Sequence, residues 1–190
     1  MSKKHSLHIK NMVCNRCIMA VEDTLRKHEI PFEKVELGKA YLKTDIDSVD
    51  LPALSKDLLD IGFELLQDEK SRLVEQIKNE IVRLVHYRDG ELQINLSDYL
   101  AQKFGKDYSA LSSIFSKETG ITIEKYLILQ KTERAKELLA YKEMNISEIA
   151  YLLGYSSIAH FSAQFKKITG YTPSQFRKLE RQERKTLDDI

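Results

Sequence analysis

The 190-residue chain has no tryptophan, only three prolines and only two cysteines. It also lacks an apolar run near the 18 residues that a membrane-spanning helix needs, and its first ten residues lack the apolar core of a signal peptide. With 31% charged and 42% hydrophobic residues, this composition predicts a soluble, helix-rich globular protein rather than a disordered chain. We therefore expect a cytoplasmic protein without a membrane association, in which both cysteines are reduced thiols.

Three signatures of enzymes are missing from the sequence: a phosphate-binding glycine loop, a pair of metal-ligating histidines and a nucleophile elbow. We therefore predict that the chain is not an enzyme. The net charge is only +1, but residues 1–70 carry 11 basic and 13 acidic side chains, whereas residues 71–190 carry 19 and 16. This excess is a weak indication of nucleic-acid binding, so the placement of the lysines matters more than their number.

Residues 1–68 alternate between strand and helix patterns. The predicted elements are a strand at 6–12, a helix to about residue 28, strands at 32–37 and 39–44, a helix that begins at Asp47 or Asp50 and ends at Gly62, and a strand at 63–67. The order βαββαβ predicts a ferredoxin-like α+β domain, with two helices on one face of one sheet.

The segment M-V-C-N-R-C, residues 12–17, follows the first predicted strand and resembles the metal-binding loop of heavy-metal-associated domains. The resemblance implies that Cys14 and Cys17 are the thiolate ligands of a soft metal ion such as Cu(I), and the sequence indicates no other cofactor. Two thiols three residues apart at a helix N-terminus suit this role, because the helix dipole is expected to lower the thiol pKa. However, Asn11 stands where the family has a glycine that shapes the loop.

Two other interpretations of the cysteine pair remain open. Cys14 and Cys17 can pack as small hydrophobic residues or remain unused thiols, because a single C-x-x-C is only a moderate signal. A thioredoxin-like redox pair is the third possibility, although the segment is short for that fold.

A helix is predicted from Glu69 to about Tyr87, because Leu73, Ile77, Ile81 and Leu84 recur at helical spacing. The sequence Arg88-Asp89-Gly90-Glu91 would end it in a turn. We expect this segment, 69–92, to connect the domain at 1–68 with an all-α domain at 93–190, against which it packs.

Residues 145–169 have the pattern of two helices joined by a glycine turn. Asn145 and Glu148 form a capping box before the first helix, and Gly154 follows it. A second helix, capped by Ser156 or Ser157, would bury Phe161 and Phe165 and expose polar and basic residues. This pattern is typical of a helix-turn-helix unit that binds duplex DNA, although an ordinary helical hairpin is the alternative.

The same unit occurs twice in the sequence. LAQKFG at 100–105 matches IAYLLG at 149–154, and LSSIFSKETGIT at 111–122 matches FSAQFKKITGYT at 161–172. The offset between the copies increases from 49 to 50, so the first turn is one residue shorter. A helix at 123–141 is predicted to link the two units.

The motif I-x-E-I-A-x-x-x-G-Y-S at 146–156 and the motif F-S-x-x-F-K-K-x-x-G-x-T-P-x-x-F-R at 161–177 resemble the AraC/XylS family of bacterial transcription regulators. The resemblance implies two tandem helix-turn-helix units on a linker helix. Such units can place two recognition helices in successive major grooves, about 34 Å apart. It also implies duplex DNA and RNA polymerase as partners, and it leaves a homodimer open.

The resemblance also places the residues that would contact DNA on the two second helices. They are Lys106, Tyr108, Ser109, Ser112, Ser113 and Lys117 in the first unit, and Ser156, Ser157, Ile158, His160, Ala163, Lys166 and Lys167 in the second. Ser113 and Ala163 stand where family members often have arginine. We therefore expect bases to be contacted by Ser, His and apolar side chains, and phosphates by the lysines.

Three functions remain open at this point. The first is a sequence-specific transcription regulator controlled by metal or thiol chemistry at Cys14 and Cys17. The second is a soft-metal carrier, which would show no specific DNA binding. In the third, the N-terminal domain of a regulator only mediates assembly.

Overall fold

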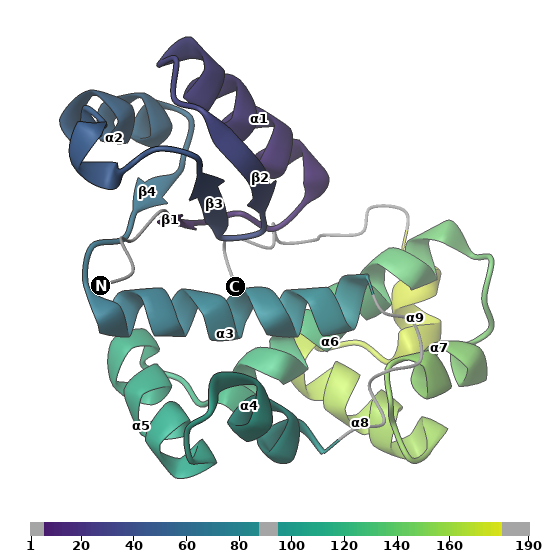
Figure 1. Cartoon of the computed structure of the whole chain (residues 1–190). Coiled ribbons are helices and arrows are strands. Elements are labelled where there is room, and N and C mark those ends of the chain that lie inside the picture. Colours follow the sequence, from purple (N-terminus) through teal and green to yellow (C-terminus); the bar gives the residue numbers. More distant parts are fainter. Residues whose placement is uncertain (1–5, 88–94, 180–190) are drawn as a thin grey trace. The chain divides into compact units, whose positions relative to one another are not determined.

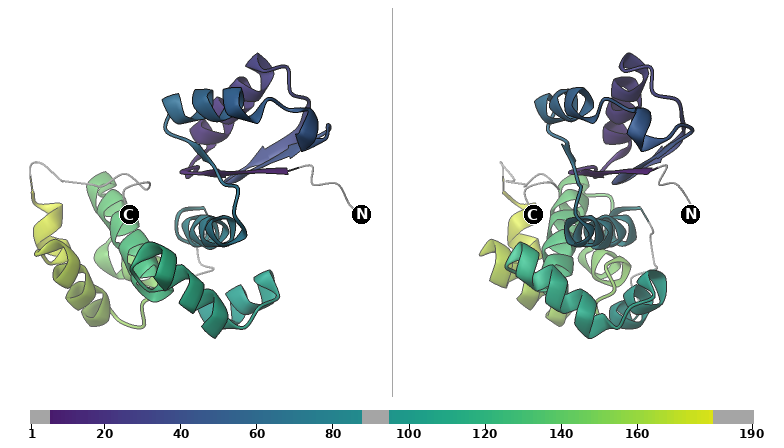
Figure 2. Two further views of the ribbon diagram at one scale, coloured as in Figure 1. Left: turned by 90° about the vertical axis from the view of Figure 1, so that its left-hand side faces the viewer. Right: turned by 60° about the vertical axis from the view of Figure 1, so that its left-hand side comes forward.

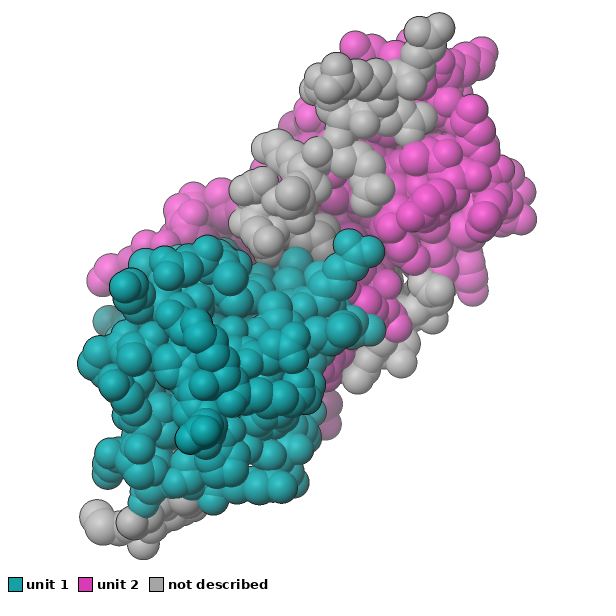
Figure 3. Space-filling model, turned by 90° about the horizontal axis from the view of Figure 1, so that it is seen from above, with its two compact units in different colours: residues 1–79 teal, residues 80–190 magenta. Residues whose placement is uncertain are grey.

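The computed structural model describes residues 6–87 and 95–179, which form two compact units, 1–79 and 80–190 (Figures 1 and 3). The predicted turn at 88–91 lies outside the described residues. The predicted fold class is confirmed, since a four-stranded antiparallel α+β region precedes an all-helical region.

Unit 1 contains one antiparallel sheet in the strand order β2-β3-β1-β4. Its strands are β1 (Ser6–Lys10), β2 (Phe32–Glu36), β3 (Lys39–Leu42) and β4 (Glu64–Leu65). In the register, Leu7 pairs with Ala40, Val35 also pairs with Ala40, and Ile9 pairs with Leu65. The predicted βαββαβ order is therefore confirmed, although β4 has only two residues.

Two helices, α1 (Asn15–Lys27) and α2 (Leu51–Asp60), cover one face of this sheet (Figure 2). A short 3-10 helix, η1 (Ile46–Ser48), precedes α2. Asp50 caps α2 by accepting a hydrogen bond from the Ala53 N–H at 3.1 Å, so the second predicted start is the correct one. Leu7, Ile9, Leu25, Leu54 and Leu58 form the centre of the core between the sheet and the helices.

Asn11 adopts the left-handed conformation (φ 71°) that a glycine would adopt easily. Asn is one of the few other residues that tolerate this region, because its short polar side chain can form local hydrogen bonds. Here the Asn11 amide donates to the Gly62 carbonyl at 2.9 Å, and its backbone N–H donates to Glu75 Oε1 at 3.1 Å. The change from glycine to asparagine therefore does not prevent the loop from adopting a glycine-like backbone.

Helix α3 (Glu69–His86) is the predicted long helix, and it contributes to both units. In unit 1, Gln76 Nε2 lies 3.2 Å from His8 Nδ1, on the face of the sheet opposite to the core. Asn79 lies against Gly38, where an added Cβ would come within 2.1 Å of Asn79 Nδ2. In unit 2, the buried Glu80 pairs with Lys103 at 2.8 Å. The bounds 1–68, 69–92 and 93–190 remain a prediction.

In the described residues 95–179, unit 2 continues with six helices. They are α4 (Leu96–Phe104), α5 (Tyr108–Thr119), α6 (Ile123–Tyr141), α7 (Ile146–Leu152), α8 (Ile158–Thr169) and α9 (Pro173–Arg177). Helix α6 contacts α5 of the first pair, both helices of the second pair, α7 and α8, and the following helix α9, and Figure 1 shows the two pairs toward different ends of α6. The predicted linker helix is thus confirmed at 123–141.

The turns of both helical pairs depend on a glycine in the left-handed conformation. Gly105 (φ 60°) ends α4, and Gly154 (φ 68°) follows α7. The Lys106 N–H donates to the Ala101 carbonyl at 3.3 Å, and the Tyr155 N–H donates to the Ala150 carbonyl at 2.9 Å. These equivalent bonds show that the sequence repeat is also a structural repeat.

Within residues 6–87 and 95–179, no helix combines the length and the apolar character that crossing a membrane requires.

Candidate nucleic-acid interface

Helix α8 is held by one apolar face and leaves the other exposed. Phe161 and Phe165 are each 1% exposed, as predicted, and Ser157 caps the helix by accepting a hydrogen bond from the His160 N–H at 3.1 Å. All seven predicted contact residues of this unit are exposed: Ser156, Ser157, Ile158, His160, Ala163, Lys166 and Lys167. Helix α8 therefore has the amphipathic form that a recognition helix requires.

Helix α5 repeats this arrangement with one difference. Leu111 and Phe115 are buried, and four of the predicted contact residues, Lys106, Ser109, Ser113 and Lys117, are exposed. Ser112 is half-buried, and so is Tyr108, whose hydroxyl donates a hydrogen bond to Glu124 at the start of α6. Burial and the Glu124 carboxylate raise the pKa of Tyr108. Its hydroxyl is thus already used within the protein.

The first turn of α8 is connected to α6 through Tyr155. The Tyr155 hydroxyl donates to Gln164 Oε1 at 2.7 Å, and its ring lies 5.4 Å from the His160 ring and 5.2 Å from the Phe161 ring. Lys131 of α6 places its Nζ 5.1 Å from the Tyr155 ring centroid. These contacts were not foreseen from the sequence, because no local spacing connects residue 131 to residue 155.

Burial of polar residues on α6 is the second feature that the pattern did not indicate. Gln130 is 0% and Lys131 is 9% exposed. Gln130 is satisfied by hydrogen bonds with Tyr126 Oη at 3.0 Å and His86 Nε2 at 3.1 Å. Lys131 loses hydration and has no hydrogen-bond partner among the described residues. Burial therefore lowers its pKa to about 8.

Arg177, the last residue of the family motif, forms a hydrogen bond within unit 2. Its Nη2 donates to the Met144 carbonyl at 2.7 Å, so the end of α9 is attached to the segment that leads into α7. This charge-assisted hydrogen bond joins the residues just before α7 to the end of α9, so it closes the second helical pair at both of its ends.

The predicted metal site is a close pair of thiols. Cys14 Sγ and Cys17 Sγ are 3.4 Å apart, and both residues are partly buried. The expected lowering of the thiol pKa is wrong for Cys17, because burial raises its pKa more than backbone hydrogen bonding lowers it. Met12 is completely buried in the core. No cluster of three or more His, Cys, Asp or Glu residues occurs in the described parts of the chain, so the pair fits only an ion that accepts two sulfur ligands.

Comparison with known proteins agrees with the helical architecture. A family model described as "Helix-turn-helix domain" matches residues 100–179. The chain is 33% identical over 128 residues to the uncharacterized HTH-type transcriptional regulator YtdP of Bacillus subtilis, covering 67% of this chain and 16% of that protein. It is 30% identical over 137 residues to the HTH-type transcriptional activator RhaS of Escherichia coli, covering 67% and 48%. The chain thus spans less than half the length of these relatives.

The fold is also similar to that of solved structures. The C-terminal domain of AraT, a response regulator from Geobacillus stearothermophilus, superposes with a TM-score of 0.52 at 28% identity, covering 61% of this chain and 91% of that domain. The family model matches only residues 100–179, and the resemblance of residues 1–68 to heavy-metal-associated domains stays a prediction. The duplicated helical pairs, the motifs and these relatives together show that residues 100–179 form a helix-turn-helix domain of the AraC/XylS type.

Proposed function

We propose that this chain binds duplex DNA with α5 and α8 in two successive major grooves and regulates transcription there. The observation that carries the proposal is the duplicated amphipathic helix, since each copy buries an apolar face against its own unit and exposes a polar one. Ser113 and Ala163 lie near the middle of the two exposed faces, so the helices present small side chains at their centres.

Small central residues favour close approach of the helix backbone to the base edges. Base discrimination then comes from neighbouring side chains such as Ser109 and His160, while lysines attract the phosphates. Lys167 and its counterpart Lys117 occupy equivalent positions near the C-terminal ends of α8 and α5. This division predicts that the lysines set affinity and that His160 sets preference at one base pair.

Replacing Lys166 and Lys167 by alanine tests this division. Each change is expected to weaken binding to all duplexes and to reduce the slope of log affinity against log salt by about one, because each lysine displaces about one counterion. The measurement is fluorescence anisotropy with a selected and a scrambled duplex at several salt concentrations.

Lys43→Ala, an exposed lysine of unit 1, is the matched control and should leave the slope unchanged. Loss of preference for the selected duplex at an unchanged salt slope would contradict the assignment of these lysines to phosphates.

We further propose that Cys14 and Cys17 bind one Cu(I) ion and that this ion modulates DNA binding. The support is the 3.4 Å separation of the two sulfur atoms. Soft thiolate ligands favour Cu(I), although the raised pKa of Cys17 means that binding must displace a proton.

Anaerobic titration of the reduced full chain with Cu(I), in competition with a colorimetric chelator, is expected to give one ion per chain. The Cys14→Ser, Cys17→Ser double variant should lose this binding, and Met19→Ala, an exposed neighbour on α1, should retain it. If Cu(I) binds but DNA affinity is the same with and without it, unit 1 does not control DNA binding through the metal. A protein that binds Cu(I) but no duplex would instead be a carrier.

A further inference from the structure

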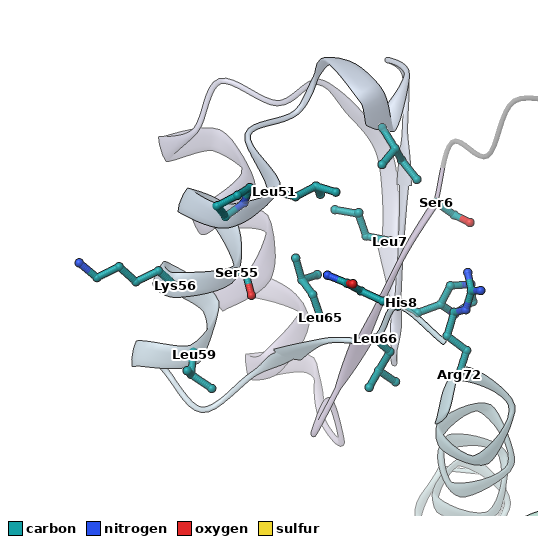
Figure 4. Close-up of a pocket in the computed structure, with 13 residues that line it drawn as sticks. Ser6, Leu7, His8, Leu51, Ser55, Lys56, Leu59, Leu65, Leu66 and Arg72 are labelled. Carbon is teal, nitrogen blue, oxygen red and sulfur yellow. The ribbon is translucent and has the colours of Figure 1, made fainter. Parts of the chain in front are cut away.

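Unit 1 contains a cavity of about 630 Å³ beside α2, at the edge of the sheet (Figure 4). The cavity follows from the lengths of two elements. Helix α2 has ten residues, whereas β4, which lies under it, has only two. The sheet therefore ends before the helix does, and the volume falls within the range of about 300–1,000 Å³ that is typical of small-molecule sites.

The inner wall of the cavity is mainly apolar. It includes Leu51 and Leu59 from α2, Leu7 from β1, Leu65 from β4 and Leu66, which follows β4 (Figure 4). Leu59 is 64% exposed, although its position on α2 places it beside the buried Leu58. Covering this exposed apolar side chain with an apolar ligand would remove apolar surface from water, which favours binding.

The polar part of the lining is basic. None of the thirteen lining residues is acidic, whereas Lys56, Arg72 and His8 are among them. This contrasts with the acidic excess of residues 1–70 as a whole. Figure 4 shows His8, Ser6 and Arg72 together on the β1 side, and Lys56 extending from α2 on the opposite side.

The Arg72 side chain is held in place by the protein. Its Nε donates to the Asp68 carbonyl at 3.2 Å, which leaves the two Nη groups of the guanidinium for other acceptors. His8 is fixed by its contact with Gln76, at 3.2 Å. A guanidinium positioned in this way suits a planar carboxylate, which it can bind through two parallel hydrogen bonds.

We propose that this cavity binds a small organic anion with an apolar body, a medium-chain carboxylate, whose carboxylate faces Arg72 and whose chain lies along Leu51, Leu59 and Leu65. The charge of the lining excludes a cationic ligand, and the apolar wall disfavours a small hydrophilic anion. This site is separate from the cysteine pair and does not depend on DNA binding.

Titration of the full chain with octanoate by isothermal titration calorimetry tests the proposal. We expect saturable binding of one octanoate per chain, with octylammonium and acetate binding at least tenfold more weakly. Equal binding of octylammonium would overturn the assignment of an anionic ligand. Equal binding of acetate would overturn the role of the apolar wall, and the absence of saturation by octanoate would overturn the site.

Two variants locate the ligand. Arg72→Gln removes the charge from a partly exposed residue and should weaken octanoate binding about tenfold, because a charge-assisted hydrogen bond is lost. Lys56→Gln removes a charge on the opposite side of the cavity, and Lys43→Gln removes one outside it. Each of these variants should change the affinity for octanoate less than twofold. A larger loss in Lys56→Gln than in Arg72→Gln would overturn the orientation. Ser55→Phe fills the cavity and should abolish binding, with thermal unfolding confirming that the variant is folded.

Discussion

Replacing Phe165 by alanine is expected to lower the free energy of unfolding of unit 2 by about 3–5 kcal/mol, the range for removing a buried aromatic ring. Phe165 is 1% exposed, and it lies on α8, with ring contacts to Phe161 of the same helix and to Phe176 of α9. Its ring centroid is 5.7 Å from that of Phe161 and 5.5 Å from that of Phe176. The substitution therefore removes ring contacts on two sides and leaves a cavity that neither neighbour can fill without changing rotamer.

Urea unfolding followed by circular dichroism at 222 nm measures this loss, since most of the helical residues belong to unit 2. Ile158→Ala is the matched control, because Ile158 lies on the same helix but is 49% exposed, and it should cost less than about 1 kcal/mol. If the Phe165 variant lost no more stability than this control, the aromatic cluster would not be the support of α8. DNA affinity should fall together with stability, because the exposed face of α8 depends on the buried one.

The sequence predicted those parts of the fold that depend on local patterns. The left-handed glycines at the two turns, the capping box at Asn145 and the buried pair Phe161 and Phe165 are all visible in short windows. The strand order β2-β3-β1-β4 could be predicted from the βαββαβ order, because few topologies connect these elements.

Features that depend on contacts between distant segments could not be predicted in this way. The contact of Gly38 with Asn79 joins a strand turn to a helix 41 positions later, and only the structure shows why a side chain at residue 38 would not fit. The raised pKa of Cys17 reflects burial, which competes with the helix dipole and is not apparent from the C-x-x-C motif. The candidate DNA contacts were predicted as exposed, but the use of the Tyr108 hydroxyl by Glu124 was not.

The burial of Lys131 also depends on contacts between distant segments, and replacing this residue is expected to change stability strongly. Replacing Lys131 by methionine is expected to stabilise unit 2 by about 2–3 kcal/mol at pH 7. Burial lowers the pKa of Lys131 from 10.5 to about 8, and a shift of this size corresponds to a cost of about 3 kcal/mol for keeping the amine charged. Methionine has a similar length and no charge, and loss of the contact with the Tyr155 ring offsets part of the gain.

The sign of the pH dependence distinguishes this cause from improved packing. Below pH 8 the folded and unfolded states both hold the proton, so the full cost is present in the native protein. Between pH 8 and 10.5 the folded state loses the proton first, so the wild-type protein gains stability as pH rises. The advantage of Lys131→Met should therefore shrink by about 1.4 kcal/mol per pH unit above pH 8.

Urea unfolding at pH 7.0 and pH 9.5 checks this expectation. Both values lie below the pKa of about 12 to which burial raises Tyr155, so the neighbouring phenol stays protonated in the native state. Lys125→Met, on the exposed side of the same helix, should change stability by less than about 0.5 kcal/mol at either pH. An advantage of Lys131→Met that is equal at both pH values would mean that packing, and not the buried charge, is responsible. Since Lys131 contacts the residue that supports the start of α8, a neutral replacement also tests whether its charge is retained for DNA binding rather than for stability.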